Sequence, residues 1–171
     1  MKNVVLIGFM GTGKTVVGRR LARILRREFV DMDAEIERVT GKSVRQIFAE
    51  DGETRFRSEE NILCEKLATR ENLVIATGGG IVLNPENVAY LKEGGILIGL
   101  RADPEVILRR VGRRGNRPLL RGGNKRERIE GLLRERAGAY DVAELTLDTG
   151  VGSPDRAARA IIEYLRERGY F

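Results

Sequence analysis

The chain has 171 residues, 42% of them hydrophobic, which is enough for one buried core and too few for two ordinary domains. We therefore predict a single domain over residues 1–171. Because no leader and no membrane-length apolar stretch is visible, we expect a cytoplasmic protein that does not contact membranes. The net charge of +6 could indicate nucleic acid, but only 5% of the residues are aromatic and no RNA-binding or zinc-finger motif occurs, so we expect no nucleic-acid partner.

The residue types present also restrict the metal chemistry. The chain has no histidine and a single cysteine, Cys64, so neither an internal disulfide nor a protein-ligated zinc or haem site is expected. Cys64 stands beside Leu63 in a helical pattern, which predicts an inert buried thiol. Any metal should be an oxygen-bound ion that arrives with a phosphate.

A glycine-rich loop follows the first apolar run. Residues 8–15 read Gly-Phe-Met-Gly-Thr-Gly-Lys-Thr, which has the spacing G-x-x-x-x-G-K-[ST] between a predicted strand and a helical pattern. In this pattern Lys14 reaches the β- and γ-phosphates of a nucleotide, and the Thr15 hydroxyl ligates Mg²⁺. The backbone N–H groups curl around phosphate oxygens because three positions permit unusual dihedral angles: Gly8, Gly11 and Gly13. We therefore predict a phosphate-binding loop at the start of a helix.

Strands and helices alternate along the rest of the chain. Apolar runs predict five strands at about 3–8, 28–31, 73–76, 95–100 and 144–148. Helices are expected between them, and four of these begin with capping patterns at Ser43, Asn84-Pro85, Asp103-Pro104 and Ser153-Pro154. This order predicts an α/β fold of three layers around a parallel five-stranded sheet, which gathers the loops that follow the strands at one edge.

A stretch without periodicity lies between two of the expected helices. Residues 112–124 contain four arginines among glycines and asparagines, and eleven of the 25 arginines fall between residues 101 and 136. We interpret this stretch as a mobile cationic lid. Clustered arginines close to a phosphate-binding loop favour a polyphosphate ligand.

Two aspartates lie where the second predicted strand ends and a helix begins. Asp33 could cap a helix while Asp31 merely ends the strand, since aspartate is a preferred N-cap. Alternatively, one carboxylate helps to hold the Mg²⁺ shell and the other accepts a hydroxyl proton from the substrate. Asp31 is closer to the strand and hence to the metal.

Two predicted helices carry charged residues on their apolar faces. Arg57 and Glu60 lie within the apolar arc of the helix over 53–69, where they either pair with each other or orient Arg57 toward an anion. Arg136 lies at the centre of an apolar stripe that ends at Tyr140 in the helix after Asn124. A buried guanidinium needs a carboxylate partner, either from the protein or from a ligand.

The third predicted strand runs into Gly78-Gly79-Gly80. Three successive glycines could form only a tight turn. They could also let backbone N–H groups approach a ligand closely. Both interpretations stay open from the residues alone.

Taken together, these motifs resemble those of the shikimate kinase family, from the first strand to the last helix. The matching segments are Gly8 to Thr15, Phe29-Val-Asp-Met-Asp33, Phe56-Arg57 with Glu60, Gly78 to Gly80, Arg117-Pro-Leu-Leu120, and Arg136 with Tyr140. The resemblance implies a P-loop kinase fold and ATP-dependent phosphorylation of the 3-hydroxyl of shikimate, a step of aromatic amino acid biosynthesis that requires Mg²⁺. The partners of such an enzyme are ATP and shikimate, and we expect a monomer.

The resemblance also implies roles for individual residues. The substrate region is about 31–61, and the substrate-binding residues are Asp33, Arg57, Gly78, Gly79, Gly80 and Arg136. Catalysis is expected from Lys14, Asp33 and Arg117. Thr15 and, through water, Asp31 are expected to bind the metal ion. The nucleotide-binding residues are Gly11, Thr12, Gly13, Lys14, Thr15, Val16, Arg110, Arg117 and Pro154.

One segment departs from the family pattern. Val151-Gly152-Ser153 precedes Pro154 where the family often places polar or basic residues against adenine, which leaves nucleotide selectivity open. Two alternative functions also stay open: a gluconate-type kinase, which would need other acid-binding residues, and a nucleotide-dependent regulator that binds nucleic acid. A substrate panel separates the first alternative, and stimulation of ATP turnover by RNA or DNA would favour the second.

Overall fold

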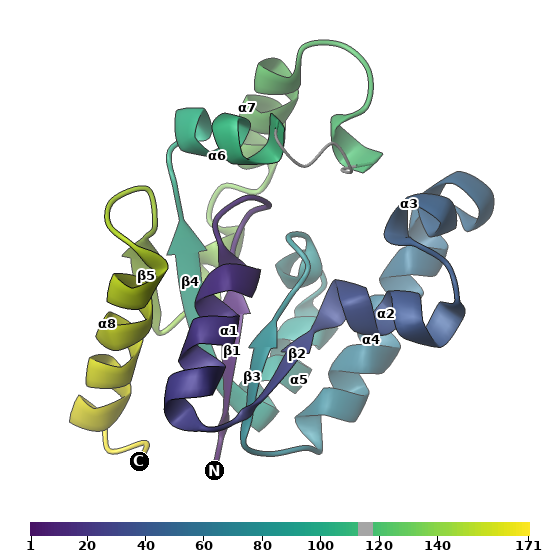
Figure 1. Cartoon of the computed structure of the whole chain (residues 1–171). Coiled ribbons are helices and arrows are strands. Elements are labelled where there is room, and N and C mark those ends of the chain that lie inside the picture. Colours follow the sequence, from purple (N-terminus) through teal and green to yellow (C-terminus); the bar gives the residue numbers. More distant parts are fainter. Residues whose placement is uncertain (113–117) are drawn as a thin grey trace.

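A parallel sheet of five strands forms the centre of the computed structural model, which describes residues 1–112 and 118–171 (Figure 1). The spatial order is β2-β3-β1-β4-β5, and every neighbouring pair is parallel. The strands are β1 Asn3–Ile7, β2 Glu28–Asp31, β3 Leu73–Ala76, β4 Gly95–Arg101 and β5 Leu145–Asp148. The structure therefore confirms the predicted α/β class and all five strands, which differ from the predicted ranges by one residue at most.

Helices cover both faces of the sheet and complete three layers. Helices α1 Lys14–Leu25 and α8 Pro154–Glu167 pack on one face, and α4 Glu53–Ala68 and α5 Pro85–Gly94 pack on the other. The alternation of side chains along β1 shows the reason, because Val4 and Leu6 belong to the core beside α1 whereas Val5 and Ile7 belong to the core beside α4.

The remaining elements stand at the edge where the strands end. On one side lie α2 Met32–Thr40, α3 Val44–Gln46 and the π-helical turn η1 Ile47–Asp51. On the other lie α6 Pro104–Gly112, the 3₁₀ turn η3 Pro118–Leu120 and α7 Lys125–Glu135. Two further 3₁₀ turns, η2 Ile81–Leu83 and η4 Ala139–Val142, follow β3 and α7. Each side has its own small apolar cluster, so the loops after β1 and β3 lie between two packed units.

Local capping chemistry sets several of the helix starts. Ser43 and Gln46 form the predicted capping box, and the side chains of Asn84 and Ser153 accept hydrogen bonds from the first turns of α5 and α8. These caps were predicted from sequence and are confirmed. No helix among residues 1–112 and 118–171 has the length and apolar character needed to cross a membrane.

One of the alternatives for the two aspartates and one helix boundary were wrong. Asp31, not Asp33, is the N-cap of α2, since its side chain accepts a hydrogen bond from the Ala34 N–H while Asp33 lies in the first turn. Helix α7 does not continue to Tyr140, because Arg136 is its C-cap and Gly138 adopts a positive φ of 79°. A left-handed glycine ends the helical hydrogen bonding, so Arg136 and Tyr140 stand on separate elements.

Candidate active site

The loop after β1 has the backbone geometry that its glycines predict. Gly8, Gly11 and Gly13 all have positive φ angles. Glycine is required at Gly8, where a Cβ would lie 2.2 Å from the carbonyl oxygen of Leu100. Gly13 is the N-cap of α1, so the loop delivers its N–H groups to the N-terminus of that helix.

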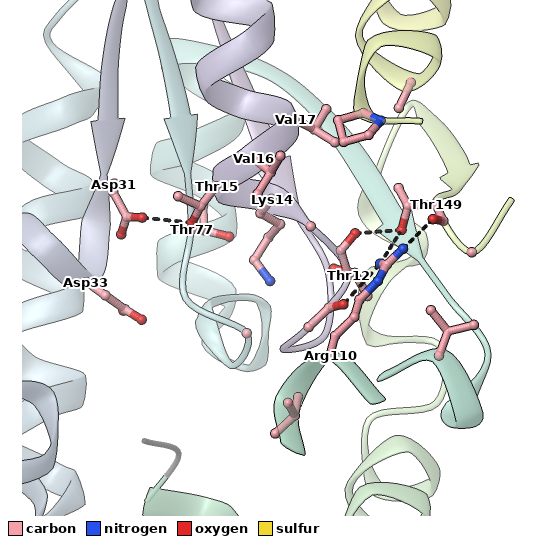
Figure 2. Close-up of a pocket in the computed structure, with 18 of the residues that line it drawn as sticks. Thr12, Lys14, Thr15, Val16, Val17, Asp31, Asp33, Thr77, Arg110 and Thr149 are labelled. Carbon is pink, nitrogen blue, oxygen red and sulfur yellow. Dashed lines mark hydrogen bonds between the residues drawn. The ribbon is translucent and has the colours of Figure 1, made fainter. Parts of the chain in front are cut away.

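The charged and hydroxyl groups of the loop point into one cavity (Figure 2). Lys14 is buried, and its Nζ donates to the carbonyl oxygens of Gly8 and Phe9 at 2.7 and 2.9 Å. Thr15 Oγ1 donates to Asp31 Oδ2 at 2.8 Å. The hydroxyl and the carboxylate predicted to serve the metal ion are thus adjacent, although they come from different elements.

The cavity has a volume of about 740 Å³, which suits a ligand of nucleotide size. All of the predicted nucleotide-binding residues within the described ranges line it: Gly11, Thr12, Gly13, Lys14, Thr15, Val16, Arg110 and Pro154. Arg117, expected to act in both nucleotide binding and catalysis, lies outside the described residues, as do residues 113–116 of the predicted lid over 112–124.

Arg110 and Thr149 connect the phosphate-binding loop to the loop after β5. The Arg110 guanidinium donates to the carbonyl oxygens of Gly11 and Thr149 at 3.2 and 2.6 Å. Thr149 Oγ1 donates to the carbonyl oxygen of Thr12 at 2.6 Å (Figure 2). These bonds hold the guanidinium at the cavity wall, so we call Arg110 and Thr149 the C-terminal brace of the loop.

A second, smaller cavity adjoins the first. Asp33, Gly78 and Gly79 line both cavities, and Figure 2 shows the Asp33 side chain pointing toward the space beside Lys14. The other predicted substrate-binding residues line the second cavity: Arg57, Gly80 and Arg136. Apolar side chains complete its wall, namely those of Met10, Val44, Phe48, Phe56 and Leu119 together with Pro118.

Arg57 and Glu60 form the ion pair that their helical spacing allowed. Arg57 Nη1 lies 2.6 Å from Glu60 Oε1, and Arg57 Nη2 lies 3.1 Å from Glu53 Oε1. The Glu60 side chain is only 1% exposed, and its Oε2 has no hydrogen-bond partner among the described residues. Burial therefore raises the pKa of Glu60 to about 7, although Arg57 opposes the shift.

Arg136 has no carboxylate within ion-pair distance among residues 1–112 and 118–171. It is 5% exposed, its guanidinium carbon lies 5.6 Å from the centre of the Phe9 ring, and Nη1 lies 3.5 Å from the Tyr140 hydroxyl. A cation–π contact offsets only part of the cost of burying this charge. Arg136 and Arg57 thus bring two guanidinium groups to the wall of the second cavity.

Several wall residues were not predicted from sequence. Thr149 and Thr77 are buried at the ends of β5 and β3, and a polar residue directly after a buried strand is a signal that could have pointed to them. Val44 and Phe48 reach the second cavity from α3 and η1, a position that depends on how these short elements fold back against α4. Local sequence carries no sign of that packing.

The structure thus places the cavity lined by the loop after β1 beside a second cavity lined by two arginines, with the Asp33 carboxylate at their junction. Comparison with known proteins identifies the family of the chain. The family model for shikimate kinase matches residues 10–166 of this chain. The chain belongs to the shikimate kinase family. It is 67% identical over 170 residues to a shikimate kinase of Desulforudis audaxviator, and the alignment covers 99% of this chain and 89% of the relative. A shikimate kinase of Pelotomaculum thermopropionicum is 66% identical, and the alignment covers 99% of each chain.

Solved structures confirm the family's kinase fold. A shikimate kinase from Acinetobacter baumannii in complex with shikimate matches with a TM-score of 0.94 and 40% identity, over 98% of this chain and 94% of that chain. A gluconokinase from Sinorhizobium meliloti has a TM-score of 0.61 at 19% identity, which shows a shared fold only. The gluconate-type alternative is therefore not favoured.

Proposed function

We propose that this chain transfers the γ-phosphoryl group of ATP to the 3-hydroxyl of shikimate, as a cytoplasmic monomer of one domain in aromatic amino acid biosynthesis. The observation that carries the proposal is the junction of the two cavities at Asp33, which lines both of them. An acceptor hydroxyl bound in the second cavity would face the phosphates bound in the first. Such positioning supplies much of the rate in phosphoryl transfer.

The carboxylate of shikimate would bind between Arg57 and Arg136. Both guanidinium groups line the second cavity, and planar guanidinium groups suit a carboxylate better than ammonium groups do. Gly80 packs against Arg57, since a Cβ at this position would lie 2.7 Å from Arg57 Nη1. The N–H groups of Gly79 and Gly80 can therefore approach the same anion, and Gly78 leaves room for Asp33 and Glu60.

Asp33 would accept the proton of the 3-hydroxyl as that oxygen attacks phosphorus. Its position in the first turn of α2 fits this role, because Asp31 already supplies the helix cap. Lys14 would bind the β- and γ-phosphates as a point charge, and Thr12, Val16, Arg110 and Pro154 would contact the rest of the nucleotide. Arg117, which lies outside the described residues, is proposed to reach the transferred phosphoryl group.

The hydroxyl of Thr15 and the carboxylate of Asp31 fit a Mg²⁺ site, because both offer oxygen and lie 2.8 Å apart. Thr15 would ligate the ion directly and Asp31 would hold a water of its shell. Among the described residues no group of three histidine, cysteine or acidic side chains could hold a metal alone, so the other ligands would be phosphate oxygens and water. When bound, Mg²⁺ neutralises charge that develops on the phosphates.

The decisive experiment is a coupled assay of ADP release with a panel of small hydroxy acids. We expect rapid, Mg²⁺-dependent ADP release with shikimate and very little with gluconate or with no acid. Equal ATP hydrolysis with and without any acid would contradict the assignment as a kinase. Faster turnover with gluconate, or stimulation by RNA or DNA alone, would favour one of the two alternative functions.

A further inference from the structure

We propose that Tyr140 is a positioning residue that holds Arg136 and the Gly79 turn in one arrangement for binding the substrate carboxylate. This inference rests on the proposed function, because it takes Arg136 and the N–H groups of Gly79 and Gly80 as carboxylate-binding groups. Tyr140 itself does not line the second cavity. It would act through its neighbours and not by touching the substrate.

The Tyr140 hydroxyl joins two segments that are distant in sequence. It donates to the carbonyl oxygen of Gly79 at 2.6 Å, across 61 residues. Arg136 Nη1 approaches the same hydroxyl oxygen at 3.5 Å, so one phenol accepts from the guanidinium and donates to the turn. A bond of this length lies within the normal range for O–H···O hydrogen bonds, and inside a protein it is electrostatically stronger than in water, so it ties the turn to Tyr140.

Gly79 lies where a small displacement would disturb both cavities. A Cβ at Gly79 would lie 3.2 Å from the backbone nitrogen of Met10, 3.6 Å from Arg136 Nη1 and 3.7 Å from the carbonyl oxygen of Gly8. The turn is thus packed between the phosphate-binding loop and the Arg136 guanidinium. Its N–H groups can meet an anion held by Arg136 only if this spacing is kept.

The ring and the hydroxyl of Tyr140 have separable roles. The ring packs against apolar residues of the cores beside α4 and beside α7, whereas the hydroxyl makes the two polar contacts. Burial raises the pKa of Tyr140, so the phenol keeps its proton near neutral pH and stays a donor. Phenylalanine at this position would keep the ring packing and remove only the two hydrogen bonds of the hydroxyl.

The test is the Tyr140→Phe variant, measured by steady-state kinetics with shikimate and ATP varied separately. We expect the KM for shikimate to rise about tenfold, as for a lost hydrogen bond that leaves its partner unsatisfied. The kcat and the KM for ATP should stay within about twofold. Tyr164→Phe is a matched control, because its hydroxyl also donates to a backbone carbonyl, that of Glu144, away from both cavities. It should change none of these constants.

A second measurement shows whether Tyr140 acts through the carboxylate-binding groups. The inhibition constant of shikimate methyl ester, which lacks the charged carboxylate, should change far less in Tyr140→Phe than the KM for shikimate does. Equal losses for acid and ester, or equal losses for shikimate and ATP, would show a merely structural role and overturn the proposal.

The variant Arg136→Lys separates failure of this inference from failure of the proposed function. If Arg136→Lys weakens shikimate binding and Tyr140→Phe does not, the positioning role is wrong and the site stands. If neither variant affects shikimate, the assignment of Arg136 to the carboxylate is itself wrong. In the double variant the two effects should combine to less than their product, because both act on one anion site.

Discussion

Glu60 holds Arg57 with one carboxylate oxygen and buries the other beside Gly78. Glu60 Oε1 lies 2.6 Å from Arg57 Nη1, whereas Oε2 would lie 2.6 Å from a Cβ on Gly78 and has no hydrogen-bond partner in the described part of the chain. The Asp33 carboxylate also raises the pKa of Glu60, and Arg136 lowers it, so the groups that face Glu60 come from α2, α4 and the end of α7. The pKa of this one buried acid therefore depends on the other charged groups that line the second cavity.

This arrangement predicts a pH-dependent stability. The pKa of Glu60 is about 7 in the folded protein against 4.5 for an ordinary glutamate, so the folded state binds the proton more tightly. The stability from this group is fully present below about pH 4.5 and is lost as the pH rises through about 7. Urea unfolding of Glu60→Gln should lack this component, which amounts to about 1.4 kcal/mol per pH unit within the interval.

Glu53→Gln is the control for that experiment, because Glu53 also pairs with Arg57 from the same helix but is largely exposed. It should keep the pH dependence of the wild-type protein. An identical pH dependence in Glu60→Gln and wild type would show that the proton is held elsewhere.

Substitution of Arg57 or Arg136 by lysine should weaken shikimate binding although the charge is kept, since the planar fork that grips a carboxylate is lost. One lost charged hydrogen bond costs about 1.5–3 kcal/mol, which corresponds to an increase of about tenfold or more in the dissociation constant. The affinity for ATP should barely change. Arg134→Lys, on the exposed side of α7, serves as the control. An effect of Arg136→Lys within about twofold would make Arg136 a structural residue.

Asp33→Asn should keep the fold and ATP binding but lower the rate of phosphoryl transfer by about 10²–10⁴-fold, the usual contribution of a general base. Single-turnover measurements with both substrates bound would report this step directly. A nearly normal rate would mean that Asp33 only orients the substrate.

Asp31→Asn separates capping from metal binding. Asparagine caps helices as well as aspartate does, so α2 and the midpoint of thermal unfolding should be unchanged. The loss of charge beside Thr15 should raise the Mg²⁺ concentration needed for half-maximal activity. If Asp31→Asn needs no more Mg²⁺ than the wild-type protein, the carboxylate serves α2 alone.

Arg117→Ala tests the proposed lid residue, for which the sequence remains the only basis. The turnover number should fall far more than the affinity for either substrate, because charge on the phosphoryl group rises in the transition state. About 10³–10⁵-fold is the ceiling for an arginine of this kind. A change in the ATP dissociation constant alone would identify Arg117 as a nucleotide clamp.

The sequence predicts those features that depend on local chemistry. Patterns among residues close together in the sequence predict the strands, the capping residues and the positive-φ glycines of the loop. The structure confirms these features. The break at Gly138 was missed because glycine is tolerated inside helical patterns, and only the packing of η4 shows that this one ends α7. The cap of α2 could not be assigned for a similar reason, since either Asp31 or Asp33 could cap the helix and the end of β2 decides.

Contacts between segments that are distant in the chain could not be predicted from the sequence. Arg110 was expected at the nucleotide, but its bonds to Thr149 span 39 residues and depend on how β5 docks beside β4. Tyr140 and Gly79 likewise meet only after the sheet has formed. Such contacts set the final shape of the site, whereas its chemistry is already visible in the residue types.

The C-terminal brace has a consequence for biosynthesis of the protein. Thr149 follows Thr12 by 137 residues, so a ribosome completes the phosphate-binding loop long before it adds the residue that anchors it. A nascent chain that ends before β5 lacks the Thr149 contacts to Thr12 and Arg110. The brace therefore forms only when the last strand docks beside β4, which makes the final geometry of the phosphate-binding loop a late event in the synthesis of the chain.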